Sequence, residues 1–430
     1  MSADAHEKLK DSARSILRDF KGDRYAFGVG CLDSAGAMAA SLGRRALIIA
    51  NQSDWMRPIV EAVRSALAAA DVDILAATPG ARPNSPVEDV YRMQEAVEKT
   101  APSVVVAIGG GSTIDAVKSA ILLACITPGE HEIESFFGVD RVSARLGGRQ
   151  LTGMLAVQTS ASSGAHLTRY SNITDFTTGQ KKLVNDPAVI PPAAVFDYSV
   201  TATAPRALTI DGALDGISHC LEVYCGAKAD TLENVEPVAL AGIELAIAGV
   251  ERACAEPHDL KAREMLGLGT DLGGCAIMKG STNAAHLTSF SLVDVTSHAR
   301  ATAVLNPYYL VLFAEATGRQ LAGLATLLWR AGYLKTDVSR LRGREAALAV
   351  GDAMQHMLAS LGVETSLEQF ENFSPAHIDR VIQAAGNPQL EMKLKAMPVP
   401  MDAGMVEHYM RGALEAAASG ELERVETIPA

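Results

Sequence analysis

The segment 102-PSVVVAIGGGSTIDAVKSAILLA-124 holds the pattern that decides the fold of this chain. The apolar run at 104–108 is typical of a strand that is buried on both faces of a sheet. It is followed by three consecutive glycines, and then by a helical pattern that we expect to begin near Ser112. The segment therefore predicts a strand, a tight turn and a helix, which is the repeating unit of a parallel sheet.

The same order of strand and helix occurs twice before this segment. The apolar run 45-RALIIAN-51 precedes an amphipathic pattern over 55–70, and 72-VDILAATP-79 precedes another over 85–100. Ser85 is expected to cap the second of these helices, because serine side chains accept hydrogen bonds from the first helical N–H groups. Three successive strand–helix units predict an α/β domain with a parallel sheet that helices cover on both faces.

The pattern changes along the second half of the chain. Residues 150–200 are rich in short, irregular strand-like runs, and the composition shifts near residue 205. From there onward the apolar residues recur with helical periodicity, interrupted by glycine and proline. The sequence thus predicts an α/β domain over residues 1–203, with an N-terminal helical extension over 1–20, and an all-helical domain over 204–430.

The bulk composition indicates an ordinary globular enzyme. The 430 residues are 48% hydrophobic and 20% charged, and the formal net charge is −12. Such an acidic balance argues against nucleic acid or an anionic membrane as a partner, because both need a basic surface. No apolar run approaches the roughly 20 residues that span a bilayer, and no secretory signal is visible. The six cysteines form no Cys-x-x-Cys pair, which favours a reducing cytoplasm.

The glycine turn is a candidate phosphate-binding site. Glycines let the backbone approach a ligand closely, and the N-terminus of the following helix offers N–H groups and a positive dipole end. The turn is neither a G-x-G-x-x-G fingerprint nor a P-loop, so a tight turn without a ligand stays an alternative. Asn51 ends the first of these strands, where an acidic residue would select NAD. A neutral amide there accepts either NAD or NADP.

A second candidate site lies in the helical part of the chain. In 211-DGALDGISHCLE-222, Asp215 and His219 are four residues apart and share one helix face. Alone, such a pair is more simply a carboxylate–imidazole hydrogen bond on a half-buried face. His286 and His298 add two imidazoles in a segment of small and apolar residues. One carboxylate and three imidazoles suit Fe(II) or Zn(II), and the ligand types do not decide between them.

These motifs, taken in order, resemble a known family, the iron-containing (group III) alcohol dehydrogenases, which include glycerol dehydrogenase and are related to dehydroquinate synthase. The resemblance covers nearly the whole chain. It rests on "GGGSTIDAVK", "SNITD", "LDGISHCLEVY", "HARATAVLNP" and "GNPQ", which follow one another in the family's order. It implies a Rossmann-like domain followed by a helical domain, in the dehydroquinate synthase-like arrangement.

The resemblance also implies an activity and a set of site residues. The activity is hydride transfer between NAD or NADP and a metal-bound alcohol or aldehyde, in a homodimer or larger homo-oligomer. The metal, Fe2+ before Zn2+, would be held by Asp215, His219, His286 and His298, with the loop before His298 about two residues shorter than is usual in the family. The cofactor would contact Asn51, Gly109, Gly110, Gly111, Ser112, Asp115, Thr159, Ser160, Ser163 and Lys182.

The chain departs from the family pattern at three positions. Gln158 and His166 stand where the family usually has proline and glutamate, and Phe290 stands where it often has a further active-site histidine. Phe290 would make the substrate pocket drier, and it removes a possible proton relay.

Two other functions remain open at this stage. A lyase or cyclase of the dehydroquinate synthase kind would use the same fold, NAD and metal, but it grips a phosphorylated acid with several Lys and Arg. The helical part has no dense basic run near the candidate ligands. The other alternative is a binding protein that has kept the fold without catalysis.

Overall fold

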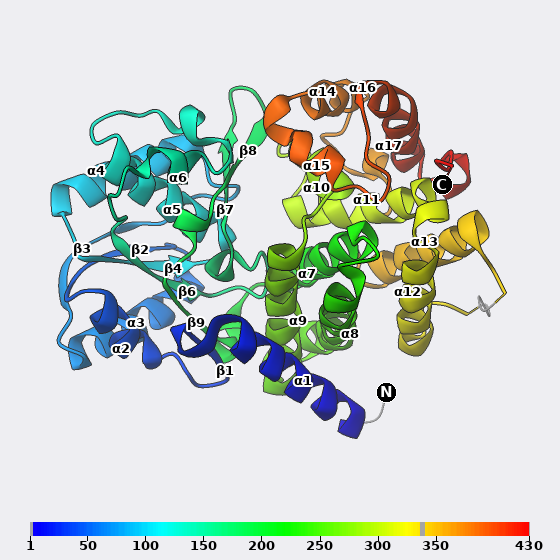
Figure 1. Ribbon diagram of the computed structural model, residues 1–430. Coiled ribbons are helices and arrows are strands. Elements are labelled where there is room, and N and C mark those ends of the chain that lie inside the picture. The colour runs from blue at the N-terminus through cyan, green and yellow to red at the C-terminus, as the bar shows by residue number, and fades with distance from the viewer. Residues whose placement is uncertain (1–2, 336–339, 430) are drawn as a thin grey trace. The chain divides into compact units, whose positions relative to one another are not determined.

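The computed structural model describes residues 3–335 and 340–429 of the chain (Figure 1). It contains two compact units, each built from separate segments. The sheet unit consists of Arg14–Thr209 and Arg252–Gly267, and the helical unit consists of Met1–Ala13, Ile210–Glu251 and Leu268–Ala430.

The sheet unit is built on a parallel six-stranded sheet, as far as the described residues show. Its strand order is β1-β9-β6-β4-β2-β3, and each neighbouring pair is parallel. The interior strand β4 is fully buried, in agreement with its continuous apolar sequence. The strands are β1 (Tyr25–Gly28), β2 (Arg45–Ala50), β3 (Asp73–Pro79), β4 (Val104–Gly109), β6 (Gly153–Gln158) and β9 (Ala193–Asp197).

Helices lie on both faces of this sheet, so the predicted α/β layering is confirmed. Figure 1 shows α2 and α3 on one face, and α4, α5 and α6 on the other. Their apolar sides pack on the alternate residues of the strands. The helices are α2 (Ser34–Leu42), α3 (Arg57–Ala69), α4 (Val87–Thr100), α5 (Gly111–Ile126) and α6 (Arg141–Leu146).

Ser85 does not cap α4, so the expectation for this residue was wrong. The helix begins two residues later, at Val87, with Pro86 as its N-cap. Ser85 has a left-handed backbone, with φ of 54°, and its hydroxyl donates to the carbonyl oxygen of Ser112 at 2.9 Å. The serine side chain therefore ties this loop to the start of α5.

A second, smaller sheet follows in the region that the sequence showed only as irregular. It contains β5 (Gly138–Val139), β7 (Tyr170–Asp175) and β8 (Gln180–Asn185). Strands β7 and β8 form an antiparallel hairpin, and β5 pairs with β8 in parallel.

The change from strands to helices occurs where the sequence predicts it. The last strand ends at Asp197, a 3-10 segment covers Tyr198–Thr203, and α7 begins at Arg206. The part of the chain described after that point contains helices and loops without strands. Its helices are α7 (Arg206–Gly226), α8 (Leu232–Ala255), α9 (Leu260–Lys279), α10 (Ala284–Ser289), α11 (His298–Leu312), α12 (Gly318–Ala331), α13 (Gly343–Ser360), α14 (Ala376–Ala385), α15 (Glu391–Lys395), α16 (Ala403–Met405) and α17 (Arg411–Ser419), and the N-terminal helix is α1 (Ala3–Lys21).

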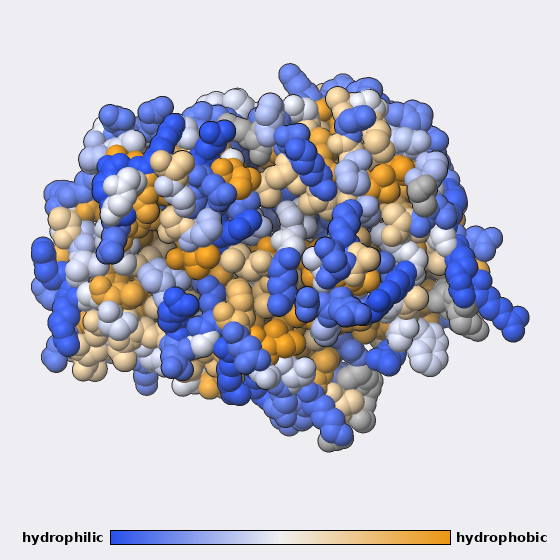
Figure 2. Space-filling model, viewed as in Figure 1, coloured by the Kyte–Doolittle hydropathy of each residue, from blue (hydrophilic) through white to orange (hydrophobic). Residues whose placement is uncertain are grey.

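Figure 2 shows one face of the surface coloured by hydropathy. Hydrophilic residues cover much of this face, and hydrophobic residues are scattered among them. Among the helices of the described residues, none is both long enough and apolar enough to cross a bilayer.

Candidate metal centre and cofactor-binding turn

Helix α7 carries three ionisable side chains along one buried stripe. Asp215, His219 and Glu222 follow one another at helical spacing, and their residues are only 3%, 5% and 2% exposed. The first two were predicted from the sequence and Glu222 was not, although Glu222 lies one further turn along the same stripe.

The other two histidines come from two later helices of the same unit. His286 lies in α10 and is buried, and His298 is the first residue of α11. Ser297 caps α11 by accepting a hydrogen bond from the backbone N–H of Arg300 at 3.3 Å. Because this cap fixes the start of α11, it also fixes the position of the His298 side chain.

Three imidazoles converge on one carboxylate oxygen. Oδ1 of Asp215 lies 3.8 Å from Nε2 of His219, 4.0 Å from Nε2 of His286 and 3.9 Å from Nε2 of His298. These separations are too long for hydrogen bonds. Ligand atoms bound about 2.0–2.2 Å from one ion lie about 3–4 Å apart, so the spacing fits a shared metal. Among the described residues, the ligand atoms of Asp215, His219 and His286 all lie within 4.8 Å of one another. His298 is outside that group, although its Nε2 lies 3.9 Å from Oδ1 of Asp215.

Hydrogen bonds turn two of the rings towards that point. Nδ1 of His286 lies 2.5 Å from a carboxylate oxygen of Glu222, and carboxylates accept hydrogen bonds. The Ser289 hydroxyl donates to the carbonyl oxygen of His286 at 2.8 Å and lies 2.8 Å from Nδ1 of His298. A hydroxyl that has given its proton to a carbonyl accepts from Nδ1. Both rings therefore carry the proton on Nδ1 and present the lone pair of Nε2 to the centre.

This donor set fits a divalent metal. It supplies one anionic oxygen and three imidazole nitrogens, which are ligands that Fe2+ and Zn2+ accept. The side chains of Asp215 and His286 are each 4% exposed, whereas that of His298 is 23% exposed. The His298 side chain is thus the more accessible of these ligand candidates.

Two buried ionisable side chains, Glu222 and Lys393, influence each other electrostatically on the Glu222 side of His286. Burial raises the pKa of the Glu222 carboxyl to about 7, while the N–H of Asn283 and the charge of Lys393 oppose that rise. Burial lowers the pKa of the Lys393 ammonium to about 8, and its attraction to Glu222 opposes the change. Lys393 also donates to the Thr282 hydroxyl. The sequence analysis did not single out this lysine, because it lies in α15, far from the histidines along the chain.

Phe290 lies next to the same centre. It is 2% exposed, and its ring centroid is 6.1 Å from that of His298. The ammonium of Lys393 lies 5.8 Å from the Phe290 ring centroid, within reach of a cation–π attraction. An apolar ring therefore occupies the position for which the family pattern often has a histidine.

The glycine turn has the geometry that was expected of it. Strand β4 ends at Gly109, and α5 begins at Gly111 with Gly110 as its N-cap. A Cβ atom on Gly110 would lie 2.7 Å from the hydroxyl oxygen of Ser160, so a side chain at this position would have to displace that hydroxyl. The N–H of Thr159 donates to the carbonyl oxygen of Gly109 at 3.2 Å. The loop that carries Thr159, Ser160 and Ser163 therefore packs against the turn.

Asn51 lies at the same edge of the sheet. Its backbone N–H donates to the carbonyl oxygen of Ile108 at 2.9 Å, one residue before the glycines. Its side-chain oxygen accepts from the N–H of Ser53 at 2.8 Å, so the amide stabilises the loop after β2. Asn51, Gly109–Ser112 and the Thr159–Ser163 loop thus meet at the carboxyl ends of the strands, where parallel sheets bind ligands.

Two of the expected cofactor residues have other partners. Asp115 is buried and forms an ion pair with Lys118 at 3.4 Å, and it accepts hydrogen bonds from Asn172 at 3.0 and 3.2 Å. Lys182 pairs with both carboxylate oxygens of Glu134, at 2.8 and 2.7 Å. Their roles towards a cofactor remain predictions.

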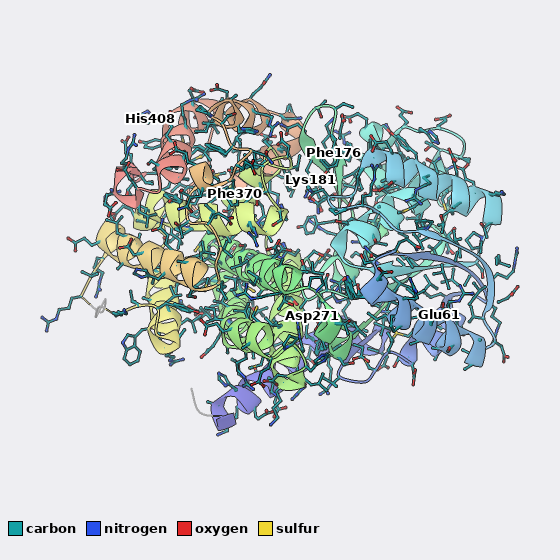
Figure 3. The ribbon with its side chains drawn as sticks, turned by 180° about the vertical axis from the view of Figure 1, so that it is seen from behind. Glu61, Phe176, Lys181, Asp271, Phe370 and His408 are labelled. Atoms are coloured by element: carbon teal, nitrogen blue, oxygen red, sulfur yellow. The ribbon has the colours of Figure 1, made fainter. Side chains whose placement is uncertain are left out.

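Lys181, the residue before Lys182, was not predicted to be a site residue. Its side chain lies on the opposite side of β8 from that of Lys182. Lys181, labelled in Figure 3, donates to the side-chain oxygen of Asn84 at 3.1 Å. The backbone N–H of Asn84 in turn donates to the Ser112 hydroxyl at 3.1 Å. Since successive residues of a strand face opposite sides, Lys181 lies on the side of the glycine turn and Lys182 on the other. This alternation along β8 was the signal that the sequence offered.

At the two remaining departures from the family pattern, Gln158 and His166, the side chains make contacts within the sheet unit. The Gln158 amide donates to the carbonyl oxygen of Ser160 at 2.6 Å, and it supports the loop beside the glycine turn. Nε2 of His166 lies 3.0 Å from the Tyr25 hydroxyl in a buried contact.

Comparison with known proteins identifies the class of protein. The family model for iron-containing alcohol dehydrogenases matches residues 22–198, and the model for the C-terminal part of that family matches residues 209–407. The chain belongs to the iron-containing alcohol dehydrogenase family. It is an oxidoreductase that acts on CH–OH groups with a metal and a nicotinamide dinucleotide.

Individual relatives have low sequence identity to this chain, but the matches extend over most of its length. The choline dehydrogenase of Bacillus subtilis is 25% identical over 372 residues, which are 84% of this chain and 89% of that protein. The NAD-dependent methanol dehydrogenase of Bacillus methanolicus is 25% identical over 304 residues, covering 70% of this chain and 77% of the relative.

Solved structures show the same fold. The alcohol dehydrogenase from an archaeon of a Red Sea brine pool has a TM-score of 0.78 at 22% identity, covering 91% of this chain and 96% of its own. The NADH-dependent butanol dehydrogenase A of Thermotoga maritima has a TM-score of 0.76 at 21% identity, with 92% and 96% covered.

Proposed function

We propose that Asp215, His219, His286 and His298 hold one divalent metal, Fe2+ in preference to Zn2+, through Oδ1 and the three Nε2 atoms. The observation that carries this proposal is the convergence of three imidazole nitrogens within 3.8–4.0 Å of one carboxylate oxygen. The substrate class follows from the family: a small alcohol on oxidation, or its aldehyde on reduction.

The four side chains prepare the site for this reaction. Asp215 contributes one negative charge and the imidazoles none, so a dication held there keeps a net positive charge towards a substrate oxygen. A divalent metal in this position supplies Lewis-acid polarisation of an alcohol or carbonyl oxygen. The exposure of the His298 side chain, 23% against 4% for Asp215, leaves room for the substrate on that side. Phe290 keeps the neighbourhood apolar and favours a less polar substrate.

We further propose that the cofactor pyrophosphate binds at Gly109, Gly110, Gly111 and Ser112. The first turn of α5 offers N–H groups that have no acceptor within the helix, and its dipole favours an anion. Asn51 leaves both NAD and NADP acceptable, since it adds no charge at the ribose. The nicotinamide ring supplies or accepts the hydride.

The same proposal covers four broader properties. The chain acts in the cytoplasm as a homodimer or larger homo-oligomer, and it has no nucleic-acid partner. Its functional domains are residues 1–203, which bind the dinucleotide, and residues 204–430, which bind the metal. The acidic net charge of −12 supports the absence of a nucleic-acid partner.

One reconstitution experiment tests the function. The purified protein is stripped with a chelator and reloaded separately with Fe2+ or Zn2+. It is then assayed with NAD+ and NADP+ against a series of primary alcohols, and with the reduced cofactors against the matching aldehydes. We expect turnover that disappears with the metal and returns on reloading. Turnover that survives complete metal removal contradicts the proposal. Binding of metal and cofactor without turnover of any alcohol or aldehyde favours a non-catalytic role.

A further inference from the structure

One carboxylate joins the two helices that carry three of the candidate ligands. An oxygen of Glu222, on α7, accepts from the backbone N–H of Asn283 at 2.7 Å and from that of His286 at 3.3 Å, while its other oxygen contacts Nδ1 of His286 at 2.5 Å. The side-chain amide of Asn283 returns a hydrogen bond to the Glu222 carbonyl oxygen at 2.9 Å. Glu222 therefore holds both the backbone and the ring of His286.

Helix α10 needs such an anchor. It has only six residues, and a helix this short is not stable on its own. Its N-cap, Asn283, and its third residue, His286, are the two positions that the Glu222 carboxylate bonds. The orientation of His286 is thus set from α7, the helix that also carries Asp215 and His219.

A buried carboxylate of this kind requires a counter-charge. Burial of a charge without a partner costs several kcal/mol, and an ionic partner offsets part of that cost. Lys393 is 4% exposed, donates to the hydroxyl of Thr282 and exerts an attractive electrostatic effect on Glu222. Thr282 immediately precedes Asn283, so the lysine is fixed beside the segment that Glu222 bonds.

We propose that Glu222 and Lys393 are a positioning pair for the metal ligand His286: the carboxylate orients the ligand, and the lysine balances the buried negative charge. This proposal rests on the ligand set of the proposed function. The pair touches neither substrate nor cofactor in this account, and it acts through His286.

The two members of the pair should affect the metal in opposite ways. Loss of the carboxylate frees the ring of His286, and loss of such an outer hydrogen bond typically weakens metal binding by about 10–100-fold. Loss of the lysine leaves the carboxylate and its bonds to His286 in place, but without a counter-charge. A bound dication beside His286 then supplies part of the missing positive charge.

The experiment compares Glu222→Gln, Lys393→Met and the double variant in the full-length protein. Two quantities are measured for each: the affinity for Zn2+ in competition with a chromophoric chelator, and the thermal unfolding midpoint with and without Zn2+. Lys118→Met is the control, because Lys118 is another buried lysine, which pairs with the buried carboxylate of Asp115 in the sheet unit.

We expect Glu222→Gln to bind Zn2+ about 10–100-fold more weakly than wild type. Lys393→Met should unfold at least about 5 °C lower without metal and gain more from Zn2+ than wild type does. The double variant should recover most of the midpoint, because no charge is left unbalanced, and keep the weak affinity of Glu222→Gln. Lys118→Met should lose stability and keep wild-type affinity for Zn2+.

Three results overturn the proposal. These are wild-type affinity in Glu222→Gln or in the double variant, an affinity in Lys393→Met as weak as in Glu222→Gln, and an equal loss of affinity in Lys118→Met. If His286 is not a metal ligand, His286→Ala keeps its metal. This result distinguishes failure of the proposed ligand set from failure of the positioning pair.

Discussion

In the proposed function, the glycine turn binds its ligand through backbone groups, and the metal centre binds its ligand through side chains. At the turn, backbone N–H groups would bind the phosphates, and a Cβ atom on Gly110 would lie 2.7 Å from the Ser160 hydroxyl oxygen. At the candidate metal centre, side-chain atoms would bind the ion, and each residue would contribute its ligand atom. The first site is therefore damaged by adding atoms, and the second by removing them.

The two sites also differ in how the chain assembles them. The turn is contiguous, because Gly109–Ser112 joins one strand to the helix that follows it. The metal centre takes ligands from α7, α10 and α11, and Glu222 and Ser289 hold two of the rings in place. A substitution at one site should leave the other intact, and the following predictions test that separation in order of decreasing effect.

The largest effect is expected from His286→Ala. It removes one of four ligands from a buried centre, so metal affinity should fall by more than the roughly 10–100-fold that loss of an outer hydrogen bond costs. Turnover should fall to background, while the affinity for NAD+ stays within about threefold of wild type. Metal content after gel filtration and fluorescence titration with NADH measure the two quantities. Full metal content in this variant would show that the third ligand lies elsewhere.

Gly110→Val should damage the other site. The added side chain occupies the space where a phosphate must approach the N-terminus of α5, and we expect cofactor affinity to fall at least about tenfold with unchanged metal content. Cofactor titration and metal analysis of the same preparation check this. Wild-type cofactor binding would mean that the turn connects a strand to a helix and has no ligand.

A double variant sharpens that test. In Gly110→Ala the new Cβ would meet the hydroxyl of Ser160, whereas in Gly110→Ala/Ser160→Ala this oxygen is gone. If the cofactor needs the space itself, both variants should bind it poorly. Recovery in the double variant would assign the loss to the clash with Ser160.

Ser289→Ala should have a moderate effect at the metal centre. It removes the hydroxyl that lies 2.8 Å from Nδ1 of His298, and this ligand is also the more exposed one. We expect metal affinity to fall by about tenfold, at the low end of the range for outer hydrogen bonds. Chelator competition measures it, with Ser291→Ala, two residues after the end of α10, as a control. An effect of Ser291→Ala as large as that of Ser289→Ala would point to disturbance of the segment between α10 and α11.

The smallest effect is expected from Asn51→Asp. The carboxylate would keep the hydrogen bond from the N–H of Ser53 and add a charge near the ribose. Two unit charges about 4 Å apart interact by about 4 kcal/mol at an effective dielectric near 20, which is an upper bound for the discrimination. Wild type should use both cofactors within roughly a hundredfold, and the variant should shift the kcat/KM ratio towards NAD(H) by about tenfold or more. An unchanged ratio means that the ribose is recognised elsewhere.

The sequence was most informative where structure is local. The strand–helix repeats and the change to helices near residue 205 depend on neighbouring residues, and both are confirmed. The expectation for Ser85 was wrong because its left-handed backbone, with φ of 54°, depends on the contact with Ser112.

The outer contacts of the metal centre could not be predicted in the same way. Lys393 reaches the Glu222 side of the centre from α15, and no local pattern connects residues so far apart. Glu222 and Lys181 were within reach of sequence reasoning: the first continues the stripe of Asp215 and His219, and the second faces the opposite side of β8 from Lys182.

The most direct test of the account is an anomalous diffraction map, recorded at the metal absorption edge from crystals of the metal-loaded protein. The account predicts one peak per chain in the helical unit, about 2.0–2.2 Å from Oδ1 of Asp215 and from Nε2 of His219, His286 and His298. A peak that is bonded to fewer than three of these atoms, or that lies beside other residues, would contradict it.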